Sequence, residues 1–284
     1  MSASEIFGGE NAESFYDEGL TASMKGDVAT AAKHFESAIR LDQSMVSAYH
    51  QVAKCYARLG DVKKGIGVLS EVVKNRPELT AARIDLAGML VQFDQYDAAK
   101  KHLQVVLNAD PHNAKALVGF AGAEFAQGMW VEALAHAQQA QDEGGANFST
   151  LYMLGRVAKL TGNSELSKTS LDKADAIIQK YQEMNEEKPE GNYLLGEITF
   201  FQGDFLAALE YFRKAEDRVL RDRLYLAYGE SFGMVDVLGK QGLCYQRLGN
   251  AERAREMGER IKKTNPDHPS CRALLSMTSG DDSA

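Results

Sequence analysis

The sequence has few of the residues on which disulfide-linked and zinc-binding proteins depend. It contains only three cysteines, five prolines and one tryptophan among 284 residues. The cysteines, Cys55, Cys244 and Cys271, lie too far apart for a disulfide framework, and no two of them have the close spacing of a zinc site. We therefore expect reduced thiols that serve as small buried apolar side chains.

The chain also lacks a long apolar stretch. No run approaches the roughly 18 consecutive apolar residues that span a bilayer, which argues against direct membrane insertion. Residues 1–11 contain Glu5 and Glu10, no lysine or arginine, and Ile6 and Phe7 as their only large apolar pair, so they do not resemble a signal peptide. We expect a cytoplasmic protein.

Positive charge is in deficit as well. The 32 basic residues against 40 acidic residues give a formal net charge of −8, which repels polyphosphates and disfavours nucleic acid as a partner. The remaining composition, 44% hydrophobic and 25% charged, suits a chain that buries a large apolar surface and is mostly helical.

What the chain does contain is a repeat with a period of 34 residues. Seven repeats begin at Ala12, Val46, Thr80, Ala114, Phe148, Pro189 and Val235. Each has a turn residue near its middle: Gly26, Gly60, Asp94, Gly128, Gly162, Gly203 and Gly249. We interpret each repeat as two helices joined by a tight turn at this residue.

Small and large residues recur at matched places in the two helices. The eighth residue is always small, as at Gly19, Ala53 and Gly155, and so is the twentieth, as at Ala31. Most repeats have a large apolar residue at the twenty-fourth place: Phe35, Leu69, Leu103, Leu171 and Phe212. Small residues let two helices approach closely, and the large residue then fills the groove between them.

This pattern resembles the tetratricopeptide repeat (TPR) over residues 12–268. In the second repeat the matching residues are Tyr49, Tyr56, Gly60, Leu69 and Pro77, and in the fifth they are Leu154, Gly155, Gly162, Leu171 and Ala174. No repeat has the family's tryptophan at its fourth residue, and the fourth repeat ends in Gly144 and Gly145 where the family prefers proline. The resemblance implies an all-α, right-handed superhelical solenoid of about seven helix-turn-helix units.

The expected organisation follows from the repeat starts. Five contiguous repeats occupy residues 12–181, two further repeats with extended helices occupy 182–268, and a capping helix at 269–277 covers the last apolar face with Leu274 and Leu275. Residues 1–11 and 278–284 are expected to be disordered.

The added stretches 182–188 and 223–234 are expected to extend the helices before them. Tyr225 and Tyr228 would then pack against the last repeat or, alternatively, form a dimer contact. In total we predict fourteen repeat helices, one capping helix and no sheet.

No catalytic or metal-binding pattern is present. His34, His102 and His136 occupy the same place in their repeats, so they are held apart along the solenoid, whereas metal ligands must converge on one point. No phosphate-binding glycine loop, paired His/Glu helix motif or nucleophile elbow occurs. We therefore expect no enzyme, no cofactor and no metal.

In the resembling family the concave groove is lined by the first helix of each repeat. The second, fifth, ninth, twelfth and thirteenth residues share that face. Repeats two to five place basic residues there without an acidic one, and the sixth and seventh are mixed. The predicted peptide-binding residues are His50, Lys54, Arg58, Lys115, Phe125, Tyr152, Arg156, Lys159, Tyr193 and Phe200. This suits a partner segment with acidic and hydrophobic side chains, for which Tyr152 would be the apolar anchor. The alternative is that these are ordinary solvated charges.

The predicted function is a scaffold or adaptor that binds a peptide segment or a protein in this groove. Chaperone C-terminal carboxylate tails are an unsuitable partner, because the places of the family's carboxylate clamp hold Tyr16, Leu20, Gln51, Ala81 and Asp85. One alternative is a self-assembling structural protein that forms homo-oligomers through its groove or its N-terminal arm with Ile6 and Phe7. Another is a peptide-sensing regulator.

Overall fold

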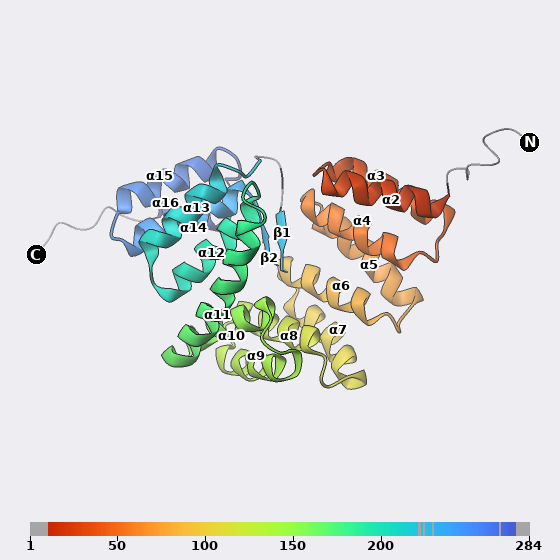
Figure 1. The fold of residues 1–284 in the computed structure, drawn as a ribbon, viewed down its shortest axis with the longest axis horizontal. Coiled ribbons are helices and arrows are strands. Elements are labelled where there is room, and N and C mark those ends of the chain that lie inside the picture. Colours follow the sequence, from red (N-terminus) through yellow and green to blue (C-terminus); the bar gives the residue numbers. More distant parts are fainter. Residues whose placement is uncertain (1–10, 221–222, 224, 229, 267, 277–284) are drawn as a thin grey trace, which may run out of the picture. The chain divides into compact units, whose positions relative to one another are not determined.

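A computed structural model describes residues 11–220, 223, 225–228, 230–266 and 268–276. These residues form fifteen α-helices and one two-stranded β-ribbon (Figure 1). They divide into two compact units, which we call the N-unit, up to Gln127, and the C-unit, from Gly128. The prediction of an all-α repeat solenoid is confirmed. Fourteen helices belong to the repeats and the last caps them.

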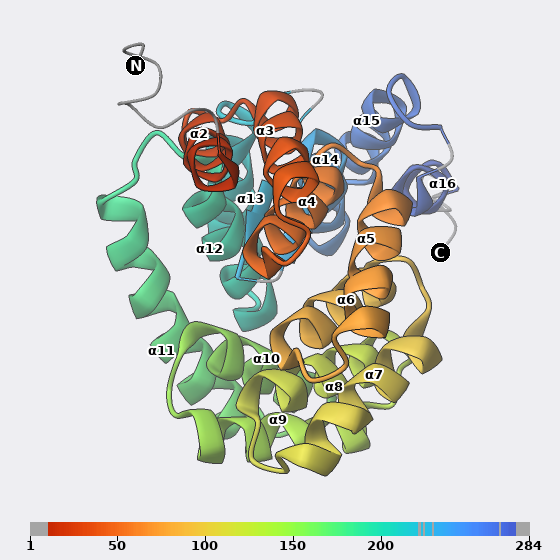
Figure 2. The ribbon, with the colours of Figure 1, turned by 90° about the vertical axis from the view of Figure 1, so that its right-hand side faces the viewer.

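The N-unit contains seven helices, each packed beside the next (Figure 2). They are α2 (Ala12–Met24), α3 (Val28–Leu41), α4 (Val46–Arg58), α5 (Val62–Asn75), α6 (Thr80–Gln92), α7 (Tyr96–Ala109) and α8 (Ala114–Ala126). We call the first helix of a repeat its A helix and the second its B helix. The even-numbered helices α2 to α8 are A helices.

The C-unit contains the remaining eight helices and the ribbon. The helices are α9 (Trp130–Gly144), α10 (Phe148–Leu160), α11 (Ser164–Glu183), α12 (Pro189–Gln202), α13 (Phe205–Glu216), α14 (Met234–Arg247), α15 (Ala251–Lys262) and α16 (Pro269–Leu275). Here α10, α12 and α14 are A helices. Six of the seven A helices in the chain begin at the residue where the sequence places the start of a repeat, and α14 begins one residue earlier.

The turn between A and B helices has a local chemical cause. Six turn glycines have φ between 74° and 96°, and Asp94 takes the same left-handed conformation at φ 58°. In five repeats the next residue is an aspartate or asparagine whose side chain caps the B helix: Asp27, Asp61, Asn163, Asp204 and Asn250. A glycine that permits the bend, followed by a capping residue, therefore starts each of these B helices.

Close helix packing depends on the small eighth residue of the repeat. A Cβ atom placed on Gly19 would lie 2.6 Å from the ring of Phe35, and one on Gly196 would lie 2.6 Å from Phe212. Phe35 and Phe212 are fully buried. The predicted exchange of small against large residues between A and B helices is thus confirmed.

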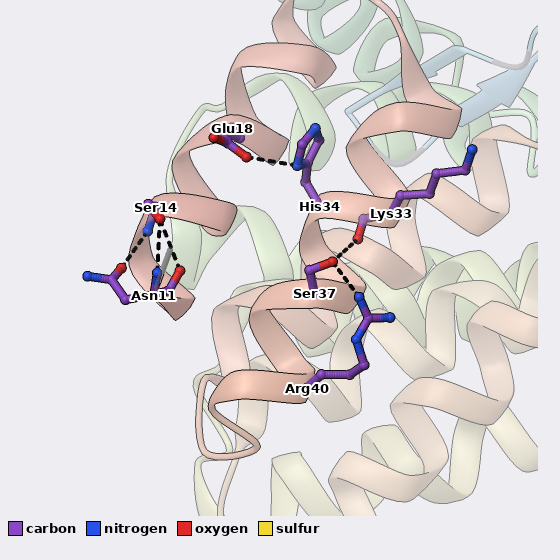
Figure 3. A network of polar contacts seen from close by, with 7 residues as sticks. All are labelled: Asn11, Ser14, Glu18, Lys33, His34, Ser37 and Arg40. Carbon is purple, nitrogen blue, oxygen red and sulfur yellow. Dashed lines mark hydrogen bonds and ion pairs between the residues drawn. The ribbon is translucent and has the colours of Figure 1, made fainter. Parts of the chain in front are cut away.

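Polar contacts also join and order the first helix pair (Figure 3). The side chain of Asn11 accepts a hydrogen bond from the backbone N–H of Ser14 and so caps α2. Glu18 of α2 forms an ion pair of 3.0 Å with His34 of α3. This contact explains the histidine at that place in the first repeat as part of the scaffold.

The two long junctions differ from the prediction of helix extensions. Helix α11 does run on, to Glu183, but residues 184–188 then form the turn that leads to Pro189. At the second junction α13 ends at Glu216, and the chain forms the antiparallel strands β1 (Tyr225–Ala227) and β2 (Glu230–Phe232). The prediction of a second extension and of no sheet was therefore wrong. Burial of the Tyr225 and Phe232 rings in the core of the C-unit outweighs the helical tendency of the segment.

The capping helix and the cysteines lie as expected. In α16, Leu274 is fully buried against Gly242 of α14, and Leu275 packs on Gly258 of α15. All three cysteines are buried free thiols. Burial raises the pKa of Cys55 to about 11 and that of Cys244 to about 12, so neither thiol is activated. The predicted N-terminal arm and C-terminal tail lie outside the described residues, apart from Asn11.

Candidate binding surfaces

The predicted groove residues lie on the faces of the A helices, which we call the A-helix face of each unit. In the N-unit, His50 and Lys54 of α4 both approach Asp85 of α6. The Nδ1 atom of His50 lies 2.8 Å from Oδ2 of Asp85, and Nζ of Lys54 lies 4.0 Å from the same atom. Asp85 is the sixth residue of its repeat, next to a groove position. The prediction of a basic face without an acidic residue was therefore wrong here, because a carboxylate partly neutralises it.

The other groove residues of the N-unit remain at least partly exposed. Arg58 donates a hydrogen bond of 3.2 Å to the hydroxyl of Ser23, Lys115 is exposed, and Phe125 is half-buried. The fifth residues of the four repeats are also half-buried: Tyr16, His50, Ile84 and Val118. The A-helix face of the N-unit thus offers apolar and charged side chains at its surface.

In the C-unit the fifth residues of the repeats belong to the core. Tyr152 is only 3% exposed and Tyr193 only 5%. Phe232 of the ribbon stacks on Tyr193 with ring centroids 3.9 Å apart and planes 3° from parallel, and Tyr228 lies 4.7 Å from Phe148 of α10. The ribbon therefore packs on the start of α12 through Phe232 and on the first residue of α10 through Tyr228.

This burial corrects the prediction for both tyrosines. Tyr152 cannot serve as an exposed apolar anchor, since Phe148 stacks on its ring at 5.2 Å and Phe201 approaches its edge at 6.5 Å. Its hydroxyl donates a hydrogen bond of 3.2 Å to Glu197. The helical spacing was right, but the spacing alone does not show what covers the face.

Glu197 joins the A helices of the C-unit below this surface. It is 3% exposed, and its carboxylate lies 2.8 Å from Nζ of Lys240 on α14. A buried carboxylate of this kind is stabilised only when it is paired and hydrogen-bonded, which Lys240 and Tyr152 provide. Glu197 therefore orders the packing of α10, α12 and α14 and is not available to a partner.

Beyond this network, the end of α10 is basic and partly exposed. The guanidinium of Arg156 lies 4.8 Å from the ring centroid of Tyr152 and 5.3 Å from that of Phe201. Lys159, one turn later, is exposed. Phe200 is half-buried and contacts Phe201 at 6.0 Å and Phe205 at 5.3 Å.

A pocket of about 330 Å³ opens at this end of the helices. Its lining comes from the end of α10, the first turns of α11 and the end of α12: Lys159, Ser164, Ser167, Lys168, Leu171, Asp172, Phe201 and Gln202. Sequence reasoning found Lys159 but missed Lys168, because Lys168 lies on a B helix, outside the positions assigned to the groove. The side chain of Asp172 is held by Gln202, whose Nε2 donates a hydrogen bond of 2.8 Å to it.

Three family models, each described as a tetratricopeptide repeat, match the chain at residues 16–79, 90–160 and 236–268, which together exceed half of its length. The chain belongs to the tetratricopeptide repeat family. TPR units typically form interaction scaffolds without enzymatic activity, so the exposed parts of the two A-helix faces are candidate binding surfaces.

Two named relatives match parts of this chain. DnaJ homolog subfamily C member 3 of Gallus gallus is 23% identical over 255 residues, which are 86% of this chain and 50% of the relative. Hsp70-Hsp90 organizing protein 3 of Arabidopsis thaliana is 29% identical over 89 residues, which are 31% of this chain and 16% of the relative. The chain thus spans about half the length of the first of these proteins.

Solved structures support the TPR fold. A tetratricopeptide repeat protein from Parabacteroides merdae aligns with a TM-score of 0.56 and 12% identity, over 94% of this chain and 98% of that one. The APC/C hetero-tetramer Cut9–Hcn1 contains a chain with a TM-score of 0.62 and 14% identity, over 92% and 48% respectively. At such low identity these likenesses show the fold alone.

The described part of the TPR chain has neither a metal-binding cluster nor a membrane-spanning helix. Among these residues, no three histidine, cysteine, aspartate or glutamate side chains lie close enough together to hold a metal ion. None of the described helices is both long and apolar enough to cross a membrane.

Proposed function

We propose that the chain is a non-enzymatic scaffold or adaptor whose N-unit binds a segment of a partner protein along its A-helix face. The observation that carries the proposal is the exposure of this face. Its fifth residues are half-buried rather than covered, and exposed Gly88 on α6 leaves open space where a side chain would stand. An extended segment could fill this space and contact the apolar residues beside it.

Charge gives the expected chemistry of the partner. Lys54, Arg58 and Lys115 bring positive charge to the face, and Asp85 offsets only part of it. A partner segment with acidic and hydrophobic side chains therefore fits best, with the charges steering its approach and apolar contacts slowing its release. Self-assembly, peptide sensing and the cytoplasmic location remain predictions from the sequence.

The test is a selection of random dodecapeptides displayed on phage against the full chain. Enriched peptides are synthesised, and their affinity for the wild type is compared with that for a Lys54→Glu/Lys115→Glu variant. We expect about tenfold weaker binding for the variant and a smaller dependence on salt, because two exposed charge contacts are reversed. The control, Lys33→Glu/Lys101→Glu, changes the charge equally at exposed lysines on B helices and should bind normally.

Failure to enrich any peptide would contradict the proposed function. If the enriched peptides bound the Lys54→Glu/Lys115→Glu variant and the control variant with equal affinity, the A-helix face of the N-unit would not be the binding surface.

A further inference from the structure

We propose that the pocket at the ends of α10 and α12 is an anchor site for an acidic side chain that neighbours an apolar side chain in an extended partner segment. The inference rests on the proposed function and adds a second, chemically defined contact point in the C-unit. It depends on three features: where the A-helix face of the C-unit is closed, where it is open, and which charges surround the opening.

The ribbon closes the first half of this face. Phe232 is fully buried against Tyr193, the fifth residue of its repeat, and Tyr225 packs on Phe232 at 5.5 Å. Lys159 is the twelfth residue of its repeat and follows the fifth residue, Tyr152, by seven positions. Seven residues of helix correspond to about 10 Å along the axis. A partner segment is therefore excluded from the start of the A helices but not from their ends.

The opening has the size of a side-chain site. Its volume of about 330 Å³ lies at the lower end of the roughly 300–1,000 Å³ typical of ligand pockets. That volume admits one or two side chains and no secondary-structure element. Phe201 and Leu171 supply apolar wall, and the hydroxyl of Ser167 is already engaged as a donor to the carbonyl of Gly155 at 2.9 Å.

The charges at the opening favour an anion. Lys159 and Lys168 are both exposed, and both line the pocket. Asp172 is the acidic group of the lining, and its hydrogen bond to Gln202 keeps it in place. Two cations beside one engaged carboxylate leave net positive charge at the opening.

These features specify the ligand. A glutamate or aspartate side chain would lie between Lys159 and Lys168, and a neighbouring apolar side chain would contact Phe201. Lysine forms such contacts as a point charge without strict geometry, so the site selects charge and an apolar neighbour rather than one exact sequence.

The experiment uses the same displayed dodecapeptide library and the full chain. Enriched peptides are expected to carry an acidic residue beside an apolar one, and their affinity is measured by fluorescence polarisation. A Lys159→Glu/Lys168→Glu variant should bind them about tenfold more weakly. Arg156 is left unchanged because its guanidinium packs on buried rings. The matched control is Lys180→Glu/Lys262→Glu, which makes the same change of charge at exposed lysines on B helices.

A variant that is expected to strengthen binding excludes misfolding as the cause of the weaker binding. Asp172→Asn removes the negative charge of the lining and keeps an acceptor for Gln202, so acidic peptides should bind more tightly to it by about threefold. Peptides resynthesised with glutamine and asparagine in place of their acidic residues should lose that gain.

The outcomes separate the two proposals. Enriched peptides that weaken with Lys54→Glu/Lys115→Glu but bind Lys159→Glu/Lys168→Glu normally would overturn the pocket and leave the proposed function standing. If the library yields no binder, both proposals are overturned. Weakening in the pocket variant together with the gain in Asp172→Asn supports the pocket.

Discussion

The fifth residue of the repeat has opposite roles in the two units. In the N-unit it stays half-buried on the A-helix face, as at Tyr16, His50 and Ile84. In the C-unit, Tyr152 and Tyr193 are core residues, because aromatic rings of α10, α12 and the ribbon pack around them. One repeat pattern thus supplies surface in one unit and core in the other, and at Tyr193 the segment inserted between two repeats provides part of the cover.

The comparison shows how insertions specialise a solenoid. Each repeat needs only its neighbours for stability, so a junction can lengthen without disturbing the register of the rest. The segment between α13 and α14 uses this freedom to bury Tyr225 and Phe232. It covers the start of α12 with aromatic side chains and leaves the end of α10 with Lys159 for contact.

The largest effect is expected when the aromatic ring of Phe232, which anchors the ribbon, is removed. Phe232→Ala should lower the free energy of unfolding by about 3–5 kcal/mol, since it deletes a fully buried aromatic side chain. Urea unfolding followed by circular dichroism and by the fluorescence of Trp130 measures it. The control is Phe93→Ala in the N-unit, where the side chain is 37% exposed and the loss should stay within about 0.5 kcal/mol. Equal losses would show that the ribbon does not form the core of the C-unit.

The second test exploits two glycines on A helices. Gly196→Ala in the C-unit should cost about 1–3 kcal/mol, because its Cβ would lie 2.6 Å from the ring of Phe212. Gly88→Ala in the N-unit has open space and should stabilise by about 0.5–1 kcal/mol, because alanine favours the helix. Thermal unfolding of both variants checks the opposite signs. A stabilised Gly196→Ala would show that the A and B helices can separate at no cost.

A smaller effect is expected at two of the three buried cysteines, one taken from each unit. Cys55→Ala and Cys244→Ala should each cost about 1–2 kcal/mol of stability and leave peptide binding unchanged. Both thiols have raised pKa values, so in the wild type they should react with a thiol reagent at pH 8 only as fast as their unit opens. Loss of binding with full stability in Cys55→Ala would instead assign the thiol a function.

The smallest effect concerns pH and the N-unit. Burial, and then the charge of Arg83, lower the pKa of His102 on α7 below its ordinary value. Above the pKa that His102 has in the unfolded chain, its imidazole is neutral in both the folded and the unfolded state, so its titration costs no stability. Below that pKa the unfolded chain binds the proton first, so stability falls as the pH falls from 7 to 5. His102→Gln should flatten this fall in urea titrations. An unchanged slope in His102→Gln would contradict the prediction.

The repeat register could be predicted because its determinants are local. A glycine such as Gly60 followed by a capping Asp61, and a small residue opposite a large one, act within a single repeat. The ribbon could not be predicted, because Tyr225 and Phe232 are fixed by contacts with α12, far away in the sequence. The groove prediction failed for the same reason at Tyr152, and it missed Asp85 and Lys168 because they approach the face from positions outside the helical pattern.

The exchange of volume between the eighth and twenty-fourth residues limits how repeats can be recombined. Gly19 is matched to Phe35 and Gly196 to Phe212, whereas the second and third repeats combine Ala53 with Leu69 and Ala87 with Leu103. A crossover at the turn glycine would join the A helix of one repeat to the B helix of another and could place alanine against phenylalanine. Crossovers between repeats keep each matched pair together. Chimeras and duplications of this chain should therefore fold when their breakpoints lie at the B-to-A junctions. The unit that can be exchanged or duplicated is the whole repeat and not the single helix.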